Sequence, residues 1–103
     1  MGQILFLPEA REDLRGIWRY LANAAGSIIS AERVVDQIHA ACRRYASQPE
    51  LGERRPDLAT DVRCFAVGSF VVYYEPLSDG IRVVQVIHGA RDVAVLFRKR
   101  RLE

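Results

Sequence analysis

Long apolar runs are missing from this 103-residue chain, and that absence limits where it can work. No run approaches the ~18 apolar residues that a transmembrane helix needs. The N-terminus also lacks the charged start, long apolar stretch and small-residue cleavage site of a signal peptide. We therefore expect a cytoplasmic protein that does not associate with membranes.

Cysteine is scarce, and its placement argues against a metal site. Cys42 and Cys64 lie far apart and outside any CxxC or Cys/His ligand spacing. In a reducing cytosol both are expected to be small buried hydrophobes. A disulfide, a nucleophile or a metal ligand are the alternatives. We predict no metal site and no cofactor.

Motifs of common enzyme classes are absent. The chain contains no GxxxxGK[ST], no GxGxxG after a strand, no HExxH and no GxSxG. Of the two histidines, His39 falls on a polar helix face. His88 ends a predicted strand and precedes the charged pair Arg91 and Asp92, so it is either a proton-transfer group or a structural cap. The structural interpretation is preferred.

Charge of one sign is also not in large excess. The formal net charge of +2 does not by itself imply a nucleic-acid partner. Basic residues cluster, however, at Arg54 and Arg55 and in a C-terminal block formed by Arg98, Lys99, Arg100 and Arg101. Such a block is either a solvated tail or the electrostatic half of an anionic binding site.

The elements that are present indicate one domain, residues 1–103, with a basic tail at about 93–103. A short apolar run at 3–7 predicts a strand that stops at Pro8. From Glu9 the apolar period becomes helical until about Gly26. A second helix, capped by Ser27 or Ser30, runs to Pro49. The two helices predict an antiparallel hairpin.

The second half of the chain has the pattern of strands. The stretch 50–61 has no period and predicts a structured loop. Three runs rich in valine, isoleucine and aromatics follow at 62–67, 70–75 and 81–88. Tight turns between them predict an antiparallel meander. The fold class is therefore α+β, in two layers and β-α-α-β-β-β order, with an antiparallel sheet packed against the α-helical hairpin.

Two groups of side chains could form a surface on that sheet. If the first and third strands of the meander present their basic residues on one face, a basic concave surface results; its members would be Arg54, Arg63, Arg82, His88 and Arg91. It would suit RNA phosphates or an acidic protein patch, whereas strand arginines can also simply mark the solvent face. Tyr73 and Tyr74 are adjacent, so one of them must face away from the helices.

Six segments, taken in order, resemble the ParE-type toxins of the ParE/RelE superfamily. They are LPEAREDL at 7–14 with Ile17, Trp18, Tyr20 and Leu21 after it, PELG at 49–52, RRPDL at 54–58, VR at 62–63, FVVYY at 70–74 and VIHGARD at 86–92. The resemblance covers about residues 7–97. It implies the same fold, a helical hairpin on an antiparallel sheet.

The resemblance also implies a function. ParE-like toxins of type II toxin–antitoxin modules inhibit DNA gyrase by protein–protein contact, and a ParD-like antitoxin neutralises them in a hetero-oligomer. Operator DNA would be touched only indirectly, through the antitoxin. The expected antitoxin-binding residues lie on the two helical stripes: Leu14, Ile17, Trp18, Leu21, Val34, Val35 and Ile38. The expected target-binding residues are basic: Arg54, Arg63, Arg82, His88, Arg91, Arg98, Lys99, Arg100 and Arg101.

Two alternative functions are compatible with the same residues. RelE-like relatives cut mRNA on the ribosome, which needs a base, an acid and cationic stabilisation of the transition state. Here Arg63, Arg82, His88 and Arg91 are the candidates, but Lys99 is the only lysine and no tyrosine follows Tyr74. The set is incomplete, so we expect no enzymatic activity. The second alternative is a binding module without toxicity.

Overall fold

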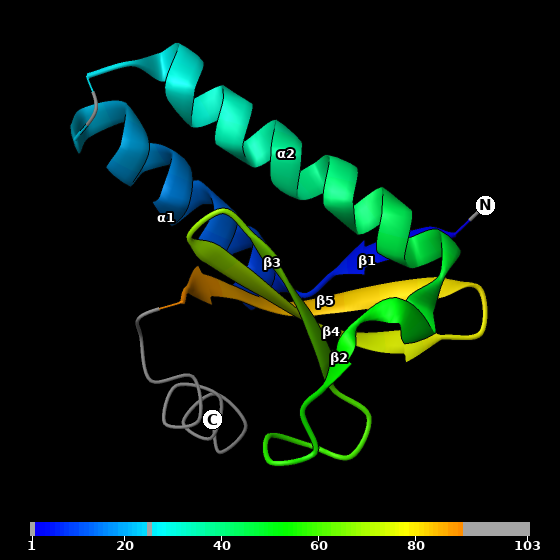
Figure 1. Cartoon of the computed structure of the whole chain (residues 1–103). Coiled ribbons are helices and arrows are strands. Elements are labelled where there is room, and N and C mark those ends of the chain that lie inside the picture. The colour runs from blue at the N-terminus through cyan, green and yellow to red at the C-terminus, as the bar shows by residue number, and fades with distance from the viewer. Residues whose placement is uncertain (1, 25, 90–103) are drawn as a thin grey trace.

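The computed structural model describes residues 2–24 and 26–89. Within them the chain forms one layer of two helices and one five-stranded sheet, and the helical hairpin lies across one face of the sheet (Figure 1). The elements are β1 (Gln3–Phe6), α1 (Pro8–Ala24), α2 (Ile28–Ser47), the 3-10 turn η1 (Pro49–Leu51), β2 (Glu53–Arg54), β3 (Arg63–Val67), β4 (Phe70–Leu77) and β5 (Gly80–His88). This confirms the α+β fold class.

The sheet order is β1-β5-β4-β3-β2, which differs from the expected arrangement in two details. First, β1 pairs in parallel with β5, so the sheet is mixed rather than wholly antiparallel. Parallel neighbours need a long crossover, which the helical hairpin and the meander together provide. Second, Glu53–Arg54 adds an edge strand inside the predicted loop. A two-residue strand is too short to leave a periodic signal in the sequence.

The helix boundaries follow local signals. α1 starts at Pro8, where the missing N–H costs no hydrogen bond. Past the end of α1 the backbone turns at Gly26, whose φ of 64° favours glycine. Ser27 caps α2 by accepting a hydrogen bond from the Ser30 N–H. Neither helix in the described part of the chain combines the length and hydropathy that crossing a bilayer demands.

The main core lies between the helices and the sheet. Leu14 and Ile17 of α1 and Ile38 of α2 pack there against Val72 and Ile81 of the strands. The ring of Tyr45 stacks on Phe65 with centroids 4.0 Å apart, which ties the end of α2 to β3. The helical stripes predicted from the sequence are therefore largely the inner faces of the two helices.

The other face of the sheet carries a second, smaller cluster. Its buried members are Val62, Cys64, Tyr73, Val84 and Ile87, and Leu58 and Ala59 of the preceding loop pack against them. The prediction that the two adjacent tyrosines face opposite sides is confirmed, since Tyr74 belongs to the main core. Tyr73 is nonetheless buried, with the Arg55 guanidinium 5.8 Å from its ring centroid. The long loop thus acts as a partial second layer.

Candidate partner-binding groove

A groove of about 690 Å³ opens between α1 and the end of the β4–β5 pair. We call it the α1–β5 groove. Its wall on the helix side spans about three turns of α1, and its wall on the sheet side comes from the start of β4 and the end of β5. The lining residues are Glu12, Asp13, Gly16, Ile17, Tyr20, Leu21, Ser69, Phe70, Val86, Ile87 and His88. It is larger than the hollow of about 510 Å³ on the outward face of α2.

The groove exists because β1 is short. The Leu7 N–H donates the last hydrogen bond of this pairing to the Val83 carbonyl (3.0 Å), and the chain then turns into α1. Beyond Val83, α1 rather than a strand lies beside β5. Gly16 faces this space, and a Cβ atom there would meet nothing within 4 Å. A glycine inside a helix costs about 1 kcal/mol relative to alanine, and here it leaves the middle of the groove open.

Apolar side chains dominate one part of the lining. Tyr20 is 67% exposed, and it lines the groove together with half-buried Leu21 and Phe70. The His88 ring meets Phe70 edge-on, with centroids 5.6 Å apart. An exposed tyrosine next to apolar side chains in a concavity is the composition of a protein-binding hot spot.

Two carboxylates on the helix side of the groove are both bonded within the fold. Asp13 Oδ2 accepts a hydrogen bond from the Val86 N–H (2.9 Å). The carboxylate thus serves as the acceptor that a backbone carbonyl of a neighbouring strand would otherwise provide. Glu12 accepts hydrogen bonds from Arg19 (2.9 Å) and Arg15 (3.2 Å). These two guanidinium groups lower the pKa of Glu12 below its usual value, and Arg19 has the larger effect. Glu12 is therefore ionised at neutral pH.

The chain is similar to known proteins over most of its length. The model of the family described as "ParE toxin of type II toxin-antitoxin system, parDE" matches residues 4–93. The chain belongs to the ParE toxin family.

Individual proteins that are similar to this chain are also ParE or ParDE proteins. Toxin ParE1 of Mycobacterium tuberculosis, from strains CDC 1551 / Oshkosh and ATCC 25618 / H37Rv, is 29% identical over 93 residues, covering 89% of this chain and 94% of the relative. A solved structure titled "Chromosomal ParDE TA system from P. aeruginosa" superposes with a TM-score of 0.71 at 18% identity. It covers 85% of this chain and 96% of that one, which supports the fold.

The antitoxin-binding residues expected for this ParE-family chain divide into two groups. Leu14, Ile17 and Ile38 are buried in the main core. The other four, Trp18, Leu21, Val34 and Val35, are half-buried. Only Ile17 and Leu21 of the seven line the groove. Apolar periodicity identifies the helix faces that pack on the sheet. It therefore missed Tyr20, which is exposed on α1, and Phe70, which begins β4.

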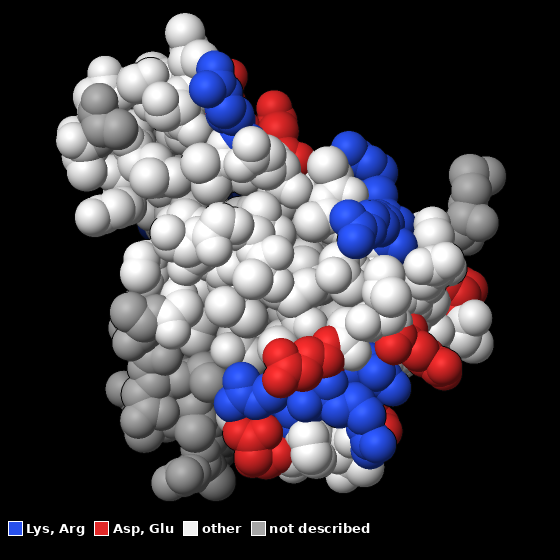
Figure 2. All heavy atoms as spheres, viewed as in Figure 1, with Lys and Arg blue, Asp and Glu red and all other residues white. Residues whose placement is uncertain are grey.

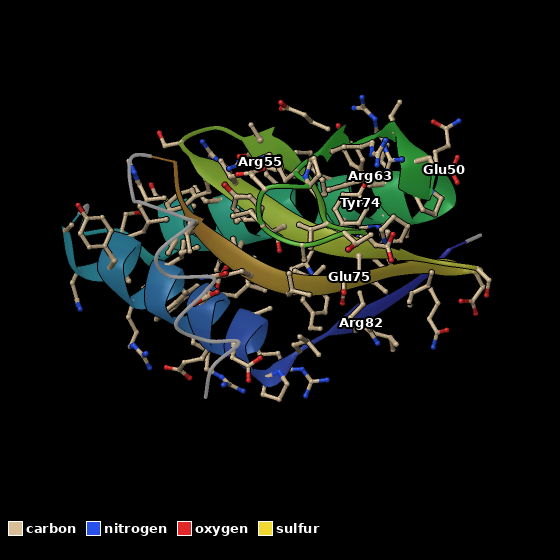
Figure 3. The ribbon with its side chains drawn as sticks, turned by 90° about the horizontal axis from the view of Figure 1, so that it is seen from below. Glu50, Arg55, Arg63, Tyr74, Glu75 and Arg82 are labelled. Atoms are coloured by element: carbon tan, nitrogen blue, oxygen red, sulfur yellow. The ribbon has the colours of Figure 1, made fainter. Side chains whose placement is uncertain are left out.

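The expected basic surface is not assembled as predicted. Arg63 lies opposite Tyr74 in the β3–β4 register and so shares the helix-facing side. Arg82 lies opposite Glu75, which points to the other side. Its Nε donates to Glu75 Oε1 at 3.0 Å. Figure 3 shows Arg63 beside Tyr74 and Arg82 beside Glu75. A residue pattern alone could not reveal this, because the face of each side chain depends on strand register.

Arg63 is engaged in holding the loop that enters the sheet. Its guanidinium donates to the carbonyl oxygens of Glu50 and Gly52, both at 2.9 Å. The Tyr74 hydroxyl donates to the Pro49 carbonyl (2.6 Å) and accepts from the Gly52 N–H (3.0 Å). Burial raises the pKa of Tyr74, so the hydroxyl keeps its proton at neutral pH. We call these contacts the Arg63–Tyr74 clamp.

The residues suggested for RNA cleavage are also separated. His88 ends β5 opposite Phe70, whereas Arg63 pairs with Tyr74, four residues further along β4. Arg82 lies on the other face, and Arg91 is outside the described residues, as are Arg98, Lys99, Arg100 and Arg101. Arg54 is exposed on the edge strand β2. Arg63, Arg82 and His88 therefore do not converge on one reacting position.

Neither thiol has the lowered pKa that is typical of a reactive cysteine. Cys42 is fully buried, and burial raises its pKa to about 12. Burial also raises the pKa of Cys64. Both are free in the structure. Within residues 2–24 and 26–89, no group of three or more His, Cys, Asp and Glu side chains is placed to hold a metal ion.

Proposed function

We propose that this ParE-family toxin inhibits DNA gyrase by protein–protein contact and is silenced by a ParD-like antitoxin bound in the α1–β5 groove. The observation that carries the antitoxin site is the groove itself, with exposed Tyr20 beside Leu21 and Phe70. The solved relative titled "Chromosomal ParDE TA system from P. aeruginosa" supports a toxin that works as one half of a pair.

The groove favours a particular kind of antitoxin segment. Its apolar part suits a segment whose apolar side chains recur along one face, as in helix-in-groove recognition. Toxin and antitoxin would then form a hetero-oligomer, and operator DNA would be reached through the antitoxin.

Contact with the target involves other residues in this proposal. Arg63 is held in its clamp and Arg82 in its ion pair, so their charges are partly used within the fold. Arg54 and His88 are exposed on the described part of the chain. We propose that these two and the C-terminal basic block contact the target.

The antitoxin site is tested by shortening one groove side chain. Tyr20→Ala should weaken binding of the cognate ParD-like antitoxin by about 30-fold, because a hot-spot truncation costs about 2 kcal/mol. Isothermal titration calorimetry would measure the dissociation constant. Leu51→Ala is the matched control, since Leu51 is 51% exposed but outside the groove. Equal losses for both variants, or no loss for Tyr20→Ala, would place the antitoxin elsewhere.

The target is tested by gyrase supercoiling of relaxed plasmid with and without the purified chain. The proposal expects loss of supercoils and appearance of linear DNA at near-stoichiometric toxin, and recovery when antitoxin is added. Unchanged supercoiling by a folded sample that inhibits growth would refute gyrase as the target. Ribosome-dependent mRNA cleavage would then be examined, with substitutions of Arg63, Arg82, His88 and Arg91.

A further inference from the structure

The outward face of α2 is a second surface, separate from the groove. It forms a shallow hollow of about 510 Å³ lined by Ile29, Glu32, Arg33, Asp36, Gln37, Ala40 and Arg43, all of them exposed. Figure 2 shows acidic and basic side chains along α2 at the upper edge of the molecule. None of these residues lines the α1–β5 groove.

The charges on this face are unpaired within the described residues. The ion pairs found among the described residues join Glu12 to Arg15 and Arg19, Arg55 to Asp57, and Arg82 to Glu75. None involves α2. Arg33 and Asp36 lie three residues apart on the same helix, yet they form no ion pair with each other. Both charges are therefore available to an external partner.

The same face carries an apolar projection and a matching gap. Ile29 is 71% exposed, the highest value for a large hydrophobic side chain among the described residues. Ala40 lies three turns further along α2 on the same side and is also exposed. The small side chain of Ala40 leaves space above the helix. The projecting side chain of Ile29 from a second copy would fit that space.

We propose that two copies of this chain pair through the outward faces of their α2 helices. The helices would run antiparallel, with the two-fold axis at the level between residues 34 and 35. Arg33 then faces Asp36 of the second copy, and Asp36 faces Arg33 of the second copy. Ile29 packs onto Ala40 of the second copy. Two-fold symmetry makes each of these contacts twice.

Charge complementarity selects this register over its neighbours. An axis near residue 36 would place Asp36 against Asp36 of the second copy. An axis near residue 38 would place Arg33 against Arg43 of the second copy. Like charges facing each other across an interface are unfavourable, so both registers are disfavoured.

The end of α1 gives independent support. In the proposed register, Arg43 reaches the level of Gly26 of the second copy, just past the end of α1. The last turn of α1 contains no basic residue. Carbonyl groups at a helix C-terminus favour a nearby cation, and Arg43 of the other copy would supply it.

The pairing is tested by sedimentation velocity of the full chain over a range of concentrations. One helix pair is a small interface, so we expect a reversible dimer with a dissociation constant on the order of 10 µM. Arg33→Asp and Asp36→Arg should each weaken it at least ~10-fold, because each places like charges together twice. The double variant Arg33→Asp/Asp36→Arg should restore it. Arg11→Asp, the same charge change on α1, should leave it unchanged.

Several results would overturn the proposal. A chain that stays monomeric at about 200 µM, twenty times the expected dissociation constant, has no such interface. A dimer unaffected by either single substitution uses another surface, and failure of the double variant to restore pairing excludes this register. Circular dichroism would verify that each variant is folded.

A second measurement does not depend on charge variants. A chain with Ile29→Cys, mixed with one carrying Ala40→Cys and mildly oxidised, should form an intermolecular disulfide. Replacing the second partner by Arg11→Cys should abolish that cross-link. Equal cross-linking to both partners would show random collision and overturn the register.

Discussion

At the scale of single residues, Tyr74 shows how one hydroxyl group joins distant segments. It lies in β4 and is fully buried, yet it bonds to Pro49 and Gly52, more than twenty positions earlier. A Cβ atom at Gly52 would overlap the Tyr74 ring, so only glycine allows this approach. Arg63 bonds to the same turn from β3. The entry into the sheet therefore depends on a few polar contacts.

Removing this hydroxyl tests its role. Tyr74→Phe should lower the free energy of unfolding by about 1–3 kcal/mol, because the buried Gly52 N–H loses its acceptor and the Pro49 carbonyl loses its donor. Urea denaturation would measure the change. Tyr45→Phe is the control, since no hydrogen bond of the Tyr45 hydroxyl is found among the described residues. A similar change in both variants would show that the hydroxyl contacts of Tyr74 add nothing.

At the scale of elements, α1 and β5 are joined by a side chain that completes the edge of the sheet. β1 pairs with β5 only as far as Val83, and Asp13 from α1 bonds to the Val86 N–H beyond that point. A buried or half-buried amide without an acceptor is costly. Asp13 thus helps hold α1 beside β5, where the groove lies.

Two substitutions separate the hydrogen bond from the charge. Asp13→Ala should destabilise the fold by about 1–3 kcal/mol, because the Val86 amide loses a charged acceptor. Asp13→Asn keeps an acceptor oxygen and should lose less than half as much. Chemical denaturation would give both values, and hydrogen exchange at Val86 should speed up more in Asp13→Ala. Equal losses in the two variants would assign the effect to charge alone.

At the scale of the whole molecule, stability should depend on pH through buried groups more than through surface pairs. Burial raises the pKa of Cys42 and of Tyr74. The folded state therefore favours their protonated forms. Their contribution is fully present below the unfolded pKa values, about 8.5 for cysteine and 10 for tyrosine, and is lost as the pH rises further.

Acidic groups act in the opposite direction. Arg19 and Arg15 lower the pKa of Glu12, and Arg55 lowers that of Asp57. Their contribution is present above the unfolded pKa of about 4 and is lost as the pH falls. Both carboxylates are exposed, and ion pairs of this kind contribute little.

The alkaline effect can be assigned to one thiol. Between about pH 9 and 11 the wild-type free energy of unfolding should fall more steeply than that of Cys42→Ala, by about 1.4 kcal/mol per pH unit, since unfolding then releases one extra proton. Urea denaturation at intervals across this range would give both slopes. Parallel slopes would show that Cys42 already ionises in the folded state.

Most of the element order could be predicted from the sequence, because helices and strands leave local periods of 3.6 and 2 residues. The stripe containing Leu14 and Ile17 predicted α1, and the valine-rich runs predicted β3, β4 and β5. The two-residue strand β2 was missed because it is shorter than any detectable period. The parallel pairing of β1 was missed because strand direction depends on the path of the chain between the strands.

The candidate site was predicted only in part. Ile17 and Leu21 were expected at the antitoxin surface and do line the groove. Tyr20 and Phe70 were not, because they come from separate elements and line one groove only after α1 packs beside β5. The basic residues were expected together, but register places Arg63 and Arg82 on opposite faces of the sheet.

The sequence by itself determined the two-helix hairpin, the three-stranded meander and the resemblance to ParE-type toxins, which the family comparison bore out. These depend on local propensity, spacing and short motifs, which are written along the chain. Only the tertiary structure decided where the groove lies, which arginines are already engaged and which face of α2 stays uncovered. Those features arise from contacts between residues far apart in sequence, and such contacts exist only after the chain has folded.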